Sequence, residues 1–265
     1  MSRISAAFSD AAADGRLVIA PYVALGYPDM PTSVELARAY LDAGANMLEL
    51  GVPFSDPIAD GPTIQRATQR ALVEGATLAG CIEAAAAIRA ATGAPLVLMG
   101  YANPFMQWGY EDLARDLQGA GVDGLIVPDL LPDDNEELAQ ACAAHDLDVI
   151  SLLAPTTPSE RIGRVAERGS GFLYCVSLTG VTGRREDLQT GLTPFLRRVG
   201  ESTTLPRAVG FGISTPAHVQ ALCGQAEAAI MASALIDIFD AAPPAAAVSR
   251  AAAQVGAMVD AARCR

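Results

Sequence analysis

Lysine is missing from this chain: all 18 of its basic residues, among 265 in total, are arginines. A lysine amine forms the Schiff base with a carbonyl substrate or with pyridoxal phosphate, and lysine is also the cation of a phosphate-binding P-loop. The sequence therefore excludes all three of these chemistries in this subunit.

Positive charge and long apolar runs are also scarce. The net charge is −12 at pH 7, and no excess of cations exists to neutralise the phosphates of nucleic acid or of an anionic membrane. No run of about 18 apolar residues could span a bilayer, and residues 1–5 lack the apolar core of a signal peptide. We therefore expect no contact with nucleic acid or membrane, and a cytoplasmic location.

Cysteine is infrequent and shows no pairing pattern. The cysteines are odd in number and widely spread, and no Cys-x-x-Cys pair occurs, which argues against a zinc site and against a disulfide framework. We expect all of them to be small buried residues in a reducing compartment. They are Cys81, Cys142, Cys175, Cys223 and Cys264.

Histidine is limited to His145 and His218, which lie in helical stretches away from any serine or cysteine in a nucleophile context. A histidine-based triad is therefore not expected. No carboxylates combine with histidine at metal-ligand spacing. Proton transfer should fall to carboxylates alone, without a metal ion.

Short apolar segments alternate with amphipathic segments along the whole chain. Their unbroken apolar character is typical of parallel strands that are covered on both faces. Eight strands separated by helices predict an α/β fold, a single (β/α)8 barrel domain over residues 1–265, with an extra helix over residues 3–14. An open doubly wound sheet is the competitor, but no Gly-x-Gly-x-x-Gly follows the first strand. The strands are expected at residues 17–23, 47–52, 95–101, 124–127, 148–153, 172–176, 208–211 and 228–231, and the helices include residues 30–43, 76–91, 110–120, 134–145 and 158–168.

Two carboxylates are placed in unlike surroundings near the second strand. Glu49 lies inside an apolar strand, on the same face as Met47 and Gly51, and burial should raise its pKa. Asp60 follows in a polar loop with Pro and Gly and should stay ionised more easily. Such a pair suits separate acid and base roles, although a strand Glu can also be an ion-pair partner and a loop Asp a helix cap.

Four aromatic residues are expected at the end of the barrel where enzymes of this fold have their active sites. They stand at the ends of strands one, three, six and seven. Together they would suit a flat aromatic substrate, whereas each one alone is more often core filling. They are Tyr22, Tyr101, Tyr174 and Phe211.

Glycine and other small residues gather after the last three strands, at residues 180–183, 212–216 and 232–234. The last two segments open helices, whose unpaired N–H groups favour a phosphate, and barrels often bind phosphate after strands seven and eight. Residues 178–190 form a polar loop with glycines that could close as a lid. Simple tight turns and a solvated connection are the alternatives.

Six segments in the same order resemble the tryptophan synthase alpha chain family, and residues 49–66 do so nearly residue for residue. The others are residues 20–26, 101–104, 127–130, 180–183 and 210–214. The resemblance implies a lyase that cleaves indole-3-glycerol phosphate to indole and glyceraldehyde 3-phosphate in L-tryptophan biosynthesis. That retro-aldol reaction uses neither a Schiff base nor a metal.

The resemblance also implies roles for individual residues. Glu49 would protonate indole C3 and accept the hydroxyl proton, Asp60 would bind the indole N–H, and Tyr174 would support the catalytic pair. Ala232 stands where the family usually has Gly, which would cause strain if its φ were positive, and Tyr22 replaces a common Phe. The implied substrate-binding residues are Tyr22, Tyr101, Thr182, Gly183, Phe211, Gly212, Ala232 and Ser233.

The family works as an alpha2beta2 complex with a pyridoxal-phosphate-dependent beta subunit, which condenses indole with serine. By resemblance, the surface near residues 53–56 and 103–104 should contact that subunit, and this chain should carry no cofactor of its own. Three alternatives remain: a stand-alone lyase that releases free indole, a non-catalytic regulatory subunit, and a barrel enzyme for another sugar phosphate.

Overall fold

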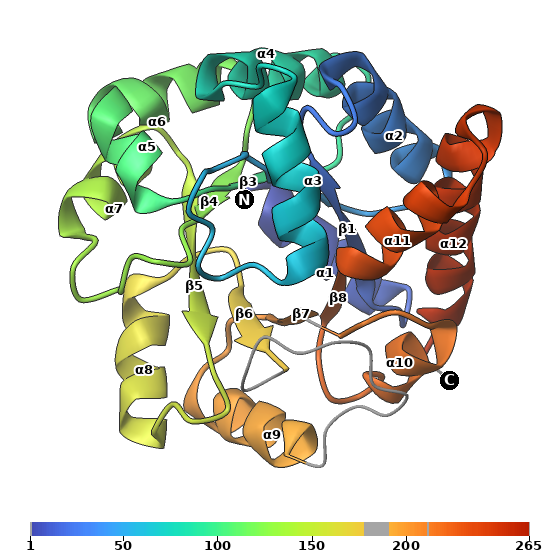
Figure 1. The fold of residues 1–265 in the computed structure, drawn as a ribbon. Coiled ribbons are helices and arrows are strands. Elements are labelled where there is room, and N and C mark those ends of the chain that lie inside the picture. Colours follow the sequence, from blue (N-terminus) through green and yellow to red (C-terminus); the bar gives the residue numbers. More distant parts are fainter. Residues whose placement is uncertain (1, 178–190, 211, 265) are drawn as a thin grey trace.

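Eight parallel strands close into a barrel in the computed structural model, which describes residues 2–177, 191–210 and 212–264 (Figure 1). Each strand pairs with the next one along the chain, and β8 pairs with β1. The predicted (β/α)8 fold and its eight strands are confirmed, with strand ends shifted by at most two residues. The strands are β1 Val18–Ala24, β2 Leu48–Gly51, β3 Leu96–Met99, β4 Gly124–Ile126, β5 Asp148–Leu153, β6 Leu173–Val176, β7 Arg207–Gly210 and β8 Ala228–Met231.

Helices surround the barrel, and one of them closes an end. The expected N-terminal helix is α1 (Arg3–Ala13), which begins where the Ser2 side chain accepts a hydrogen bond from the Ser5 N–H. Ile4 and Phe8 of α1 are buried in the cluster that fills the barrel interior. The other described helices are α2 Met30–Asp42, α3 Pro62–Val73, α4 Leu78–Arg89, α5 Ala102–Trp108, α6 Tyr110–Gly119, α7 Glu136–Ala144, α8 Ser159–Arg168, α9 Leu192–Ser202, α10 Pro216–Ala221, α11 Ser233–Ala241 and α12 Ala247–Ala261, with a short 3-10 helix at Pro244–Ala246.

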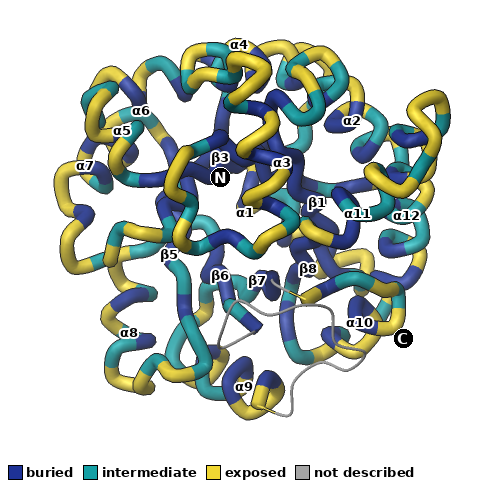
Figure 2. The backbone as a smooth tube through the Cα atoms, in the orientation of Figure 1, coloured by how far each residue is buried: buried dark blue, intermediate teal, exposed yellow. Residues whose placement is uncertain are grey.

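The core has two layers because successive side chains of a strand point to opposite faces. One layer, with Leu48 and Leu50, lies between the strands and the helices. The other lies inside the barrel and includes Met47 and the rings of Tyr22 and Tyr174. Figure 2 shows the strands buried at the centre and exposed residues on the outer faces of the helices. Glu49 alternates with Leu48 and Leu50 and therefore faces the barrel interior.

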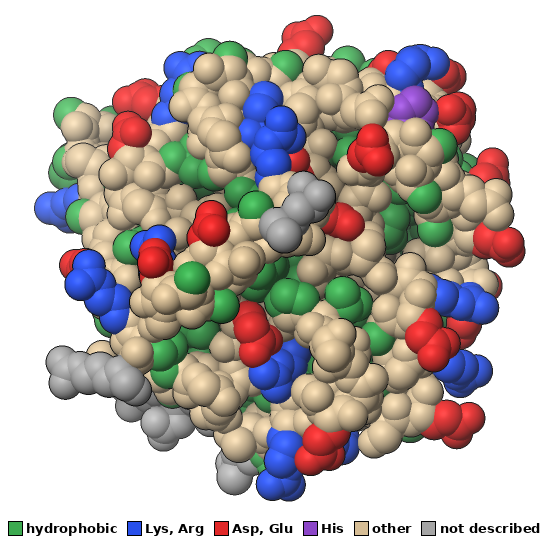
Figure 3. All heavy atoms as spheres, turned by 180° about the vertical axis from the view of Figure 1, so that it is seen from behind, with side chains coloured by type: hydrophobic (Ala, Val, Ile, Leu, Met, Phe, Trp, Pro, Cys, Tyr) green, Lys and Arg blue, Asp and Glu red, His purple; other side chains and the backbone are tan. Residues whose placement is uncertain are grey.

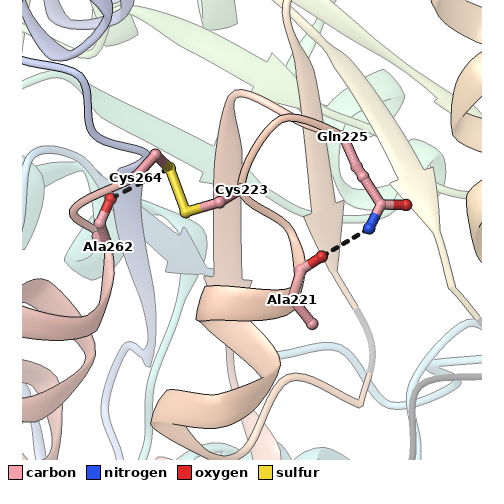
Figure 4. Close-up of a disulfide and its surroundings, with 5 residues drawn as sticks. All are labelled: Ala221, Cys223, Gln225, Ala262 and Cys264. Carbon is pink, nitrogen blue, oxygen red and sulfur yellow. Dashed lines mark hydrogen bonds between the residues drawn. A yellow bond between two sulfur atoms is a disulfide. The ribbon is translucent and has the colours of Figure 1, made fainter.

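A disulfide joins Cys223, just after α10, to Cys264 in the segment after α12 (Figure 4). The expectation that all five cysteines are thiols is therefore wrong for this pair. The two residues are 41 positions apart, and they meet because α10 packs against α12. The Cys264 N–H also donates to the Gly15 carbonyl, in the segment between α1 and β1. Cysteine spacing alone does not show such a contact. Cys81, Cys142 and Cys175 are buried free thiols, as expected.

The outer surface carries charges of both signs. Figure 3 shows acidic and basic side chains interspersed on the face opposite to that of Figure 1. Among the described residues, no single helix has the length and apolar character to cross a bilayer. The helices α3 and α4, which are bent by 103° relative to each other, meet that criterion only when taken as a pair.

Candidate active site

Glu49 is a buried carboxyl in the wall of the barrel. Its residue is 3% exposed, and it lies in register between Tyr22 of β1 and Val97 of β3. Burial, and then the nearby Asp60 carboxylate, raises the pKa of Glu49 to about 8. Its Oε2 atom has no hydrogen-bond partner among the described residues. A carboxyl of this kind holds its proton at neutral pH and can give it to a bound molecule.

Asp60 lies in the loop between β2 and α3 and is also buried, at 4% exposure. The Tyr101 hydroxyl donates a hydrogen bond to Asp60 Oδ2 over 3.0 Å. Burial raises the pKa of Asp60 to about 6, and the Tyr101 hydrogen bond acts in the opposite direction. Asp60 is therefore the more acidic of the two carboxyls, as expected. Its carboxylate is hydrogen-bonded to a tyrosine hydroxyl and is not exposed to solvent as a polar loop would suggest.

Tyr22 and Tyr174 lie over glycines of the neighbouring strands. A Cβ on Gly51 would sit 1.9 Å from the Tyr22 hydroxyl, and a Cβ on Gly210 would sit 2.1 Å from the Tyr174 hydroxyl. The rings therefore occupy space that only glycine leaves open. These two glycines are not among the site residues predicted from the sequence.

The hydroxyls of Tyr22 and Tyr174 lie close enough to Glu49 and Asp60 for the two carboxylate charges to affect them. Burial, followed by the charges of Asp60 and Glu49, raises the pKa of Tyr22 well above its usual value. Burial, followed by the same two charges in the opposite order, does so for Tyr174. The structure thus brings β1, β2 and β6 together around the predicted catalytic pair.

Tyr101 follows β3, as expected, and it is joined to the loop that carries Asp60. Its hydroxyl contacts the Asp60 loop, accepting from the Ala59 N–H over 3.1 Å while it donates to Asp60. Its ring stacks on Phe54, with ring centroids 5.1 Å apart. Tyr101 therefore supports the Asp60 carboxyl, and Phe54, which is not among the predicted site residues, supports Tyr101. The position of Phe54 inside the segment 49–66 was the one available signal for it.

Backbone donors gather after β7 and β8, which are neighbours in the barrel. Gly212 has φ of +88°, a conformation that glycine adopts without strain. Among the described residues, no hydrogen-bond acceptor faces the N–H groups of Gly212 and Ile213, or those of Ser233 and Ala234 at the start of α11. Unpaired N–H groups of this kind are suited to an anion.

Ala232 does not carry the strain that was considered for it. Its φ is −128° and its ψ is −81°, outside the left-handed region in which a Cβ is costly. The expected contributions of Thr182, Gly183 and Phe211 lie outside the described residues. Within the part of the chain that the structure describes, no three His, Cys, Asp or Glu side chains converge to hold a metal ion.

Comparison with known proteins gives a consistent result. Residues 8–263 match the family model of the tryptophan synthase alpha chain. A tryptophan synthase alpha chain of Roseiflexus sp. (strain RS-1) is 54% identical over 252 residues, covering 95% of this chain and 97% of that protein. The alpha chain of Chloroflexus aurantiacus is 49% identical over 98% of both chains. A structure of Mycobacterium tuberculosis tryptophan synthase matches with a TM-score of 0.92 and 36% identity, over 99% of this chain and 98% of that one.

Proposed function

The chain belongs to the tryptophan synthase alpha chain family, and from that premise we propose that Glu49 and Asp60 carry out its chemistry. The family cleaves indole-3-glycerol phosphate to indole and glyceraldehyde 3-phosphate, and this chain has the alpha-subunit role in L-tryptophan biosynthesis. The observation that carries the residue assignment is a pair of buried carboxyls with different pKa values, about 8 for Glu49 and about 6 for Asp60.

The difficult step is the departure of an indole C3 carbanion. The protonated Glu49 gives its proton to C3, which makes the ring an iminium-like acceptor of electrons. The Glu49 carboxylate then takes the proton of the side-chain hydroxyl as the C–C bond breaks and its electron pair returns to the ring. Indole and the aldehyde leave, and Glu49 is protonated again. The unpartnered Oε2 of Glu49 supports this role, because a general acid must be free to reach its substrate.

Asp60 acts on the other side of the indole ring. As an ionised carboxylate at neutral pH, it accepts the indole N–H and stabilises the positive charge that develops when C3 is protonated. Tyr101 orients the carboxylate through the hydrogen bond to Oδ2. Tyr22 and Tyr174 line the space for the flat ring, which makes the pocket selective for an aromatic substrate.

The phosphate of the substrate binds at the ends of β7 and β8. The N–H groups of Gly212 and Ser233 offer donors without any cation, which fits a chain that has no lysine. Ala232 belongs to this cradle through its backbone, and Thr182, Gly183 and Phe211 complete the proposed substrate site. No cofactor is assigned to this chain, since pyridoxal phosphate belongs to the beta subunit in this family.

A beta subunit is the proposed partner, in an alpha2beta2 complex. Three large apolar side chains are exposed after consecutive strands: Ile58 (76%) after β2, Met106 (61%) after β3 and Leu131 (53%) after β4. Ile58 and Met106 follow closely after the expected contact segments, residues 53–56 and 103–104, and Leu131 follows β4, the neighbour of β3 in the barrel. Exposed apolar side chains grouped at one end of a barrel are typical of a protein interface. The stand-alone lyase is not favoured, because the structure from M. tuberculosis is of tryptophan synthase.

The cytoplasmic location and the single-domain organisation over residues 1–265 belong to the same proposal. The packing of α12 against both α2 and α11 supports the latter, because it joins the end of the chain to its beginning. The three free thiols fit a reducing compartment, whereas the Cys223–Cys264 disulfide is more typical of an oxidising one.

The residue assignment is tested by indole release from indole-3-glycerol phosphate, with and without a cognate beta subunit. Glu49→Gln should lower kcat by at least about 100-fold, because general acid–base catalysis contributes on that order or more. Glu35→Gln, an exposed carboxyl on α2, is the matched control and should keep kcat within about twofold of the original chain. Normal turnover by Glu49→Gln would refute the assignment.

The partner surface is tested separately by binding of the beta subunit. Met106→Glu should weaken the complex at least about tenfold, since a charge would be buried at an apolar contact. Val73→Glu, at the last position of α3 and 75% exposed, is the matched control and should leave binding unchanged. Equal weakening by both variants would contradict the proposed surface. Full turnover without any beta subunit would favour a stand-alone lyase.

A further inference from the structure

The loop after β7 is held from behind by two side chains. His218 of α10 places its Nδ1 atom 3.1 Å from the Gly212 carbonyl oxygen. Gln254 of α12 donates from Nε2 to the Ser214 carbonyl oxygen over 3.2 Å. His218 is buried, at 7% exposure, although it comes from a helix outside the barrel. From the sequence this histidine is expected only in a helical stretch, and the structure places it against the loop that follows β7.

The contact with Gly212 determines which tautomer of His218 fits. A carbonyl oxygen can only accept a hydrogen bond. The Nδ1 atom therefore carries the hydrogen and donates it to Gly212. The same nitrogen lies 3.4 Å from the Ser214 hydroxyl oxygen and from the Ser214 backbone nitrogen. The Ser214 N–H can donate only to a bare Nδ1, but the shorter 3.1 Å distance to a carbonyl that can only accept favours the protonated Nδ1, with Gly212 as its principal partner among the described residues.

Fixing the Gly212 carbonyl also fixes the next N–H group. The peptide bond is planar and trans, so the Gly212 C=O and the Ile213 N–H point in opposite directions. With the carbonyl directed at His218, the Ile213 N–H points away from α10. That N–H has no acceptor among the described residues. Gly212 needs this support because φ of +88° is one of several conformations that glycine adopts freely.

We propose that His218 is a positioning residue for phosphate recognition: its Nδ1–H holds the Gly212 carbonyl so that the N–H groups of the β7 loop face the phosphate of the substrate. The inference rests on the proposed function, in which this loop binds the phosphate. His218 does not touch the substrate. It lowers the cost of ordering the loop on each binding event, so its contribution belongs to substrate binding and not to the chemical step.

The test compares three variants of the full-length chain, assayed with its beta subunit. His218→Leu removes the donor, His218→Gln carries its amide one bond too far, and His218→Asn keeps an N–H donor near the position of Nδ1. Each is measured for kcat and KM with indole-3-glycerol phosphate and for Kd with two probes, glycerol 3-phosphate and phosphate-free indole. His145→Leu, a histidine on the outer surface beside Glu111 and Gln118, is the matched control.

We expect His218→Leu and His218→Gln to raise KM and the Kd of glycerol 3-phosphate about fivefold, the usual effect of one lost hydrogen bond. The kcat value and the Kd of indole should stay within about twofold, and His218→Asn should restore phosphate binding. If His218→Leu does not fold, the pair His218→Gln and His218→Asn decides the question.

Unchanged glycerol 3-phosphate binding in His218→Leu and His218→Gln would overturn the proposal while leaving the phosphate site intact. Equal loss of indole and phosphate affinity would also overturn it, since a general structural role acts on both probes. If glycerol 3-phosphate fails to compete with substrate in the unaltered chain, the proposed phosphate site itself is wrong, and the role of His218 is lost with it.

Discussion

The Tyr101 hydroxyl donates a hydrogen bond to Asp60 Oδ2 over 3.0 Å, and the hydroxyl oxygen of Tyr101 also accepts a hydrogen bond from the Ala59 N–H. Tyr101 follows β3 whereas Asp60 follows β2, so one hydroxyl joins two neighbouring loops at the proposed position of the indole N–H. The contact favours the ionised form of Asp60 and opposes the effect of burial on its pKa. Asp60 can therefore remain a carboxylate at neutral pH inside a closed site.

Removing this hydroxyl should make Asp60 less acidic. In Tyr101→Phe, the pKa of Asp60 should rise above its present value of about 6, by about one unit for one lost hydrogen bond to a charged group. At pH 7 we expect kcat/KM to fall about twofold, and at pH 5 to 6 about fivefold to tenfold, because the acidic limb of the pH profile moves to higher pH. Tyr110→Phe, at the start of α6, is the control. An acidic limb that does not move would contradict the role given to Tyr101.

The pH dependence of the unaltered chain follows from the two carboxyls. Activity needs Asp60 ionised, so kcat/KM should rise as the pH passes about 6. Activity also needs Glu49 protonated, so kcat/KM should fall as the pH passes about 8. The expected profile is a bell with its maximum near pH 7. It is checked from pH 5 to 10, with circular dichroism to confirm that the fold persists. Constant activity from pH 7 to 10 would exclude Glu49 as the acid.

Gly51 should be intolerant of any side chain because of Tyr22. In Gly51→Ala, the new Cβ would meet the Tyr22 hydroxyl at 1.9 Å, and the ring must leave its position. We expect a loss of about 1–3 kcal/mol in the free energy of unfolding and at least a tenfold loss in kcat/KM. Thermal unfolding and steady-state kinetics measure both.

The matched control is Gly163→Ala on α8, where nothing lies within 4 Å of the added Cβ. That change should leave activity unaltered and raise helix stability slightly. The double variant Gly51→Ala with Tyr22→Leu should recover part of the lost stability, since the clash is then relieved. If Gly51→Ala behaves like Gly163→Ala, the close packing of Tyr22 on Gly51 is wrong.

The disulfide should contribute to stability only under oxidising conditions. Cys223→Ser opens a loop of 41 residues, and loops of that length are typically worth about 2–4 kcal/mol of unfolding free energy. Without reductant, urea unfolding should therefore show the variant to be less stable than the original chain. With excess dithiothreitol, the two should converge. Cys142→Ser alters a free thiol and is the control. The difference in unfolding free energy between this variant and the original chain should be the same with and without reductant. If dithiothreitol changes the unfolding free energy of Cys142→Ser and of Cys223→Ser equally, the disulfide does not form.

Local sequence was sufficient for the fold and for the two carboxyls. The apolar segments that become β2 and β8 are continuous, because parallel strands in a barrel are covered on both faces, and both were predicted within one residue of their ends. Glu49 was recognisable because a lone carboxylate in an apolar strand is unusual. The burial of Asp60 was not recognisable in the same way. Its immediate neighbours are loop residues, and the hydroxyl that covers it comes from Tyr101, 41 positions later.

The amino-acid sequence by itself therefore determined the barrel, the family and the identity of the catalytic candidates, since these depend on periodicity and on residue types within short segments. Only the tertiary structure decided which side chains meet: Tyr101 with Asp60, Tyr22 with Gly51, His218 with Gly212, and Cys223 with Cys264. Each of these pairs joins different elements of the barrel, and its distance depends on strand register and helix packing. No pattern within either segment contains that information.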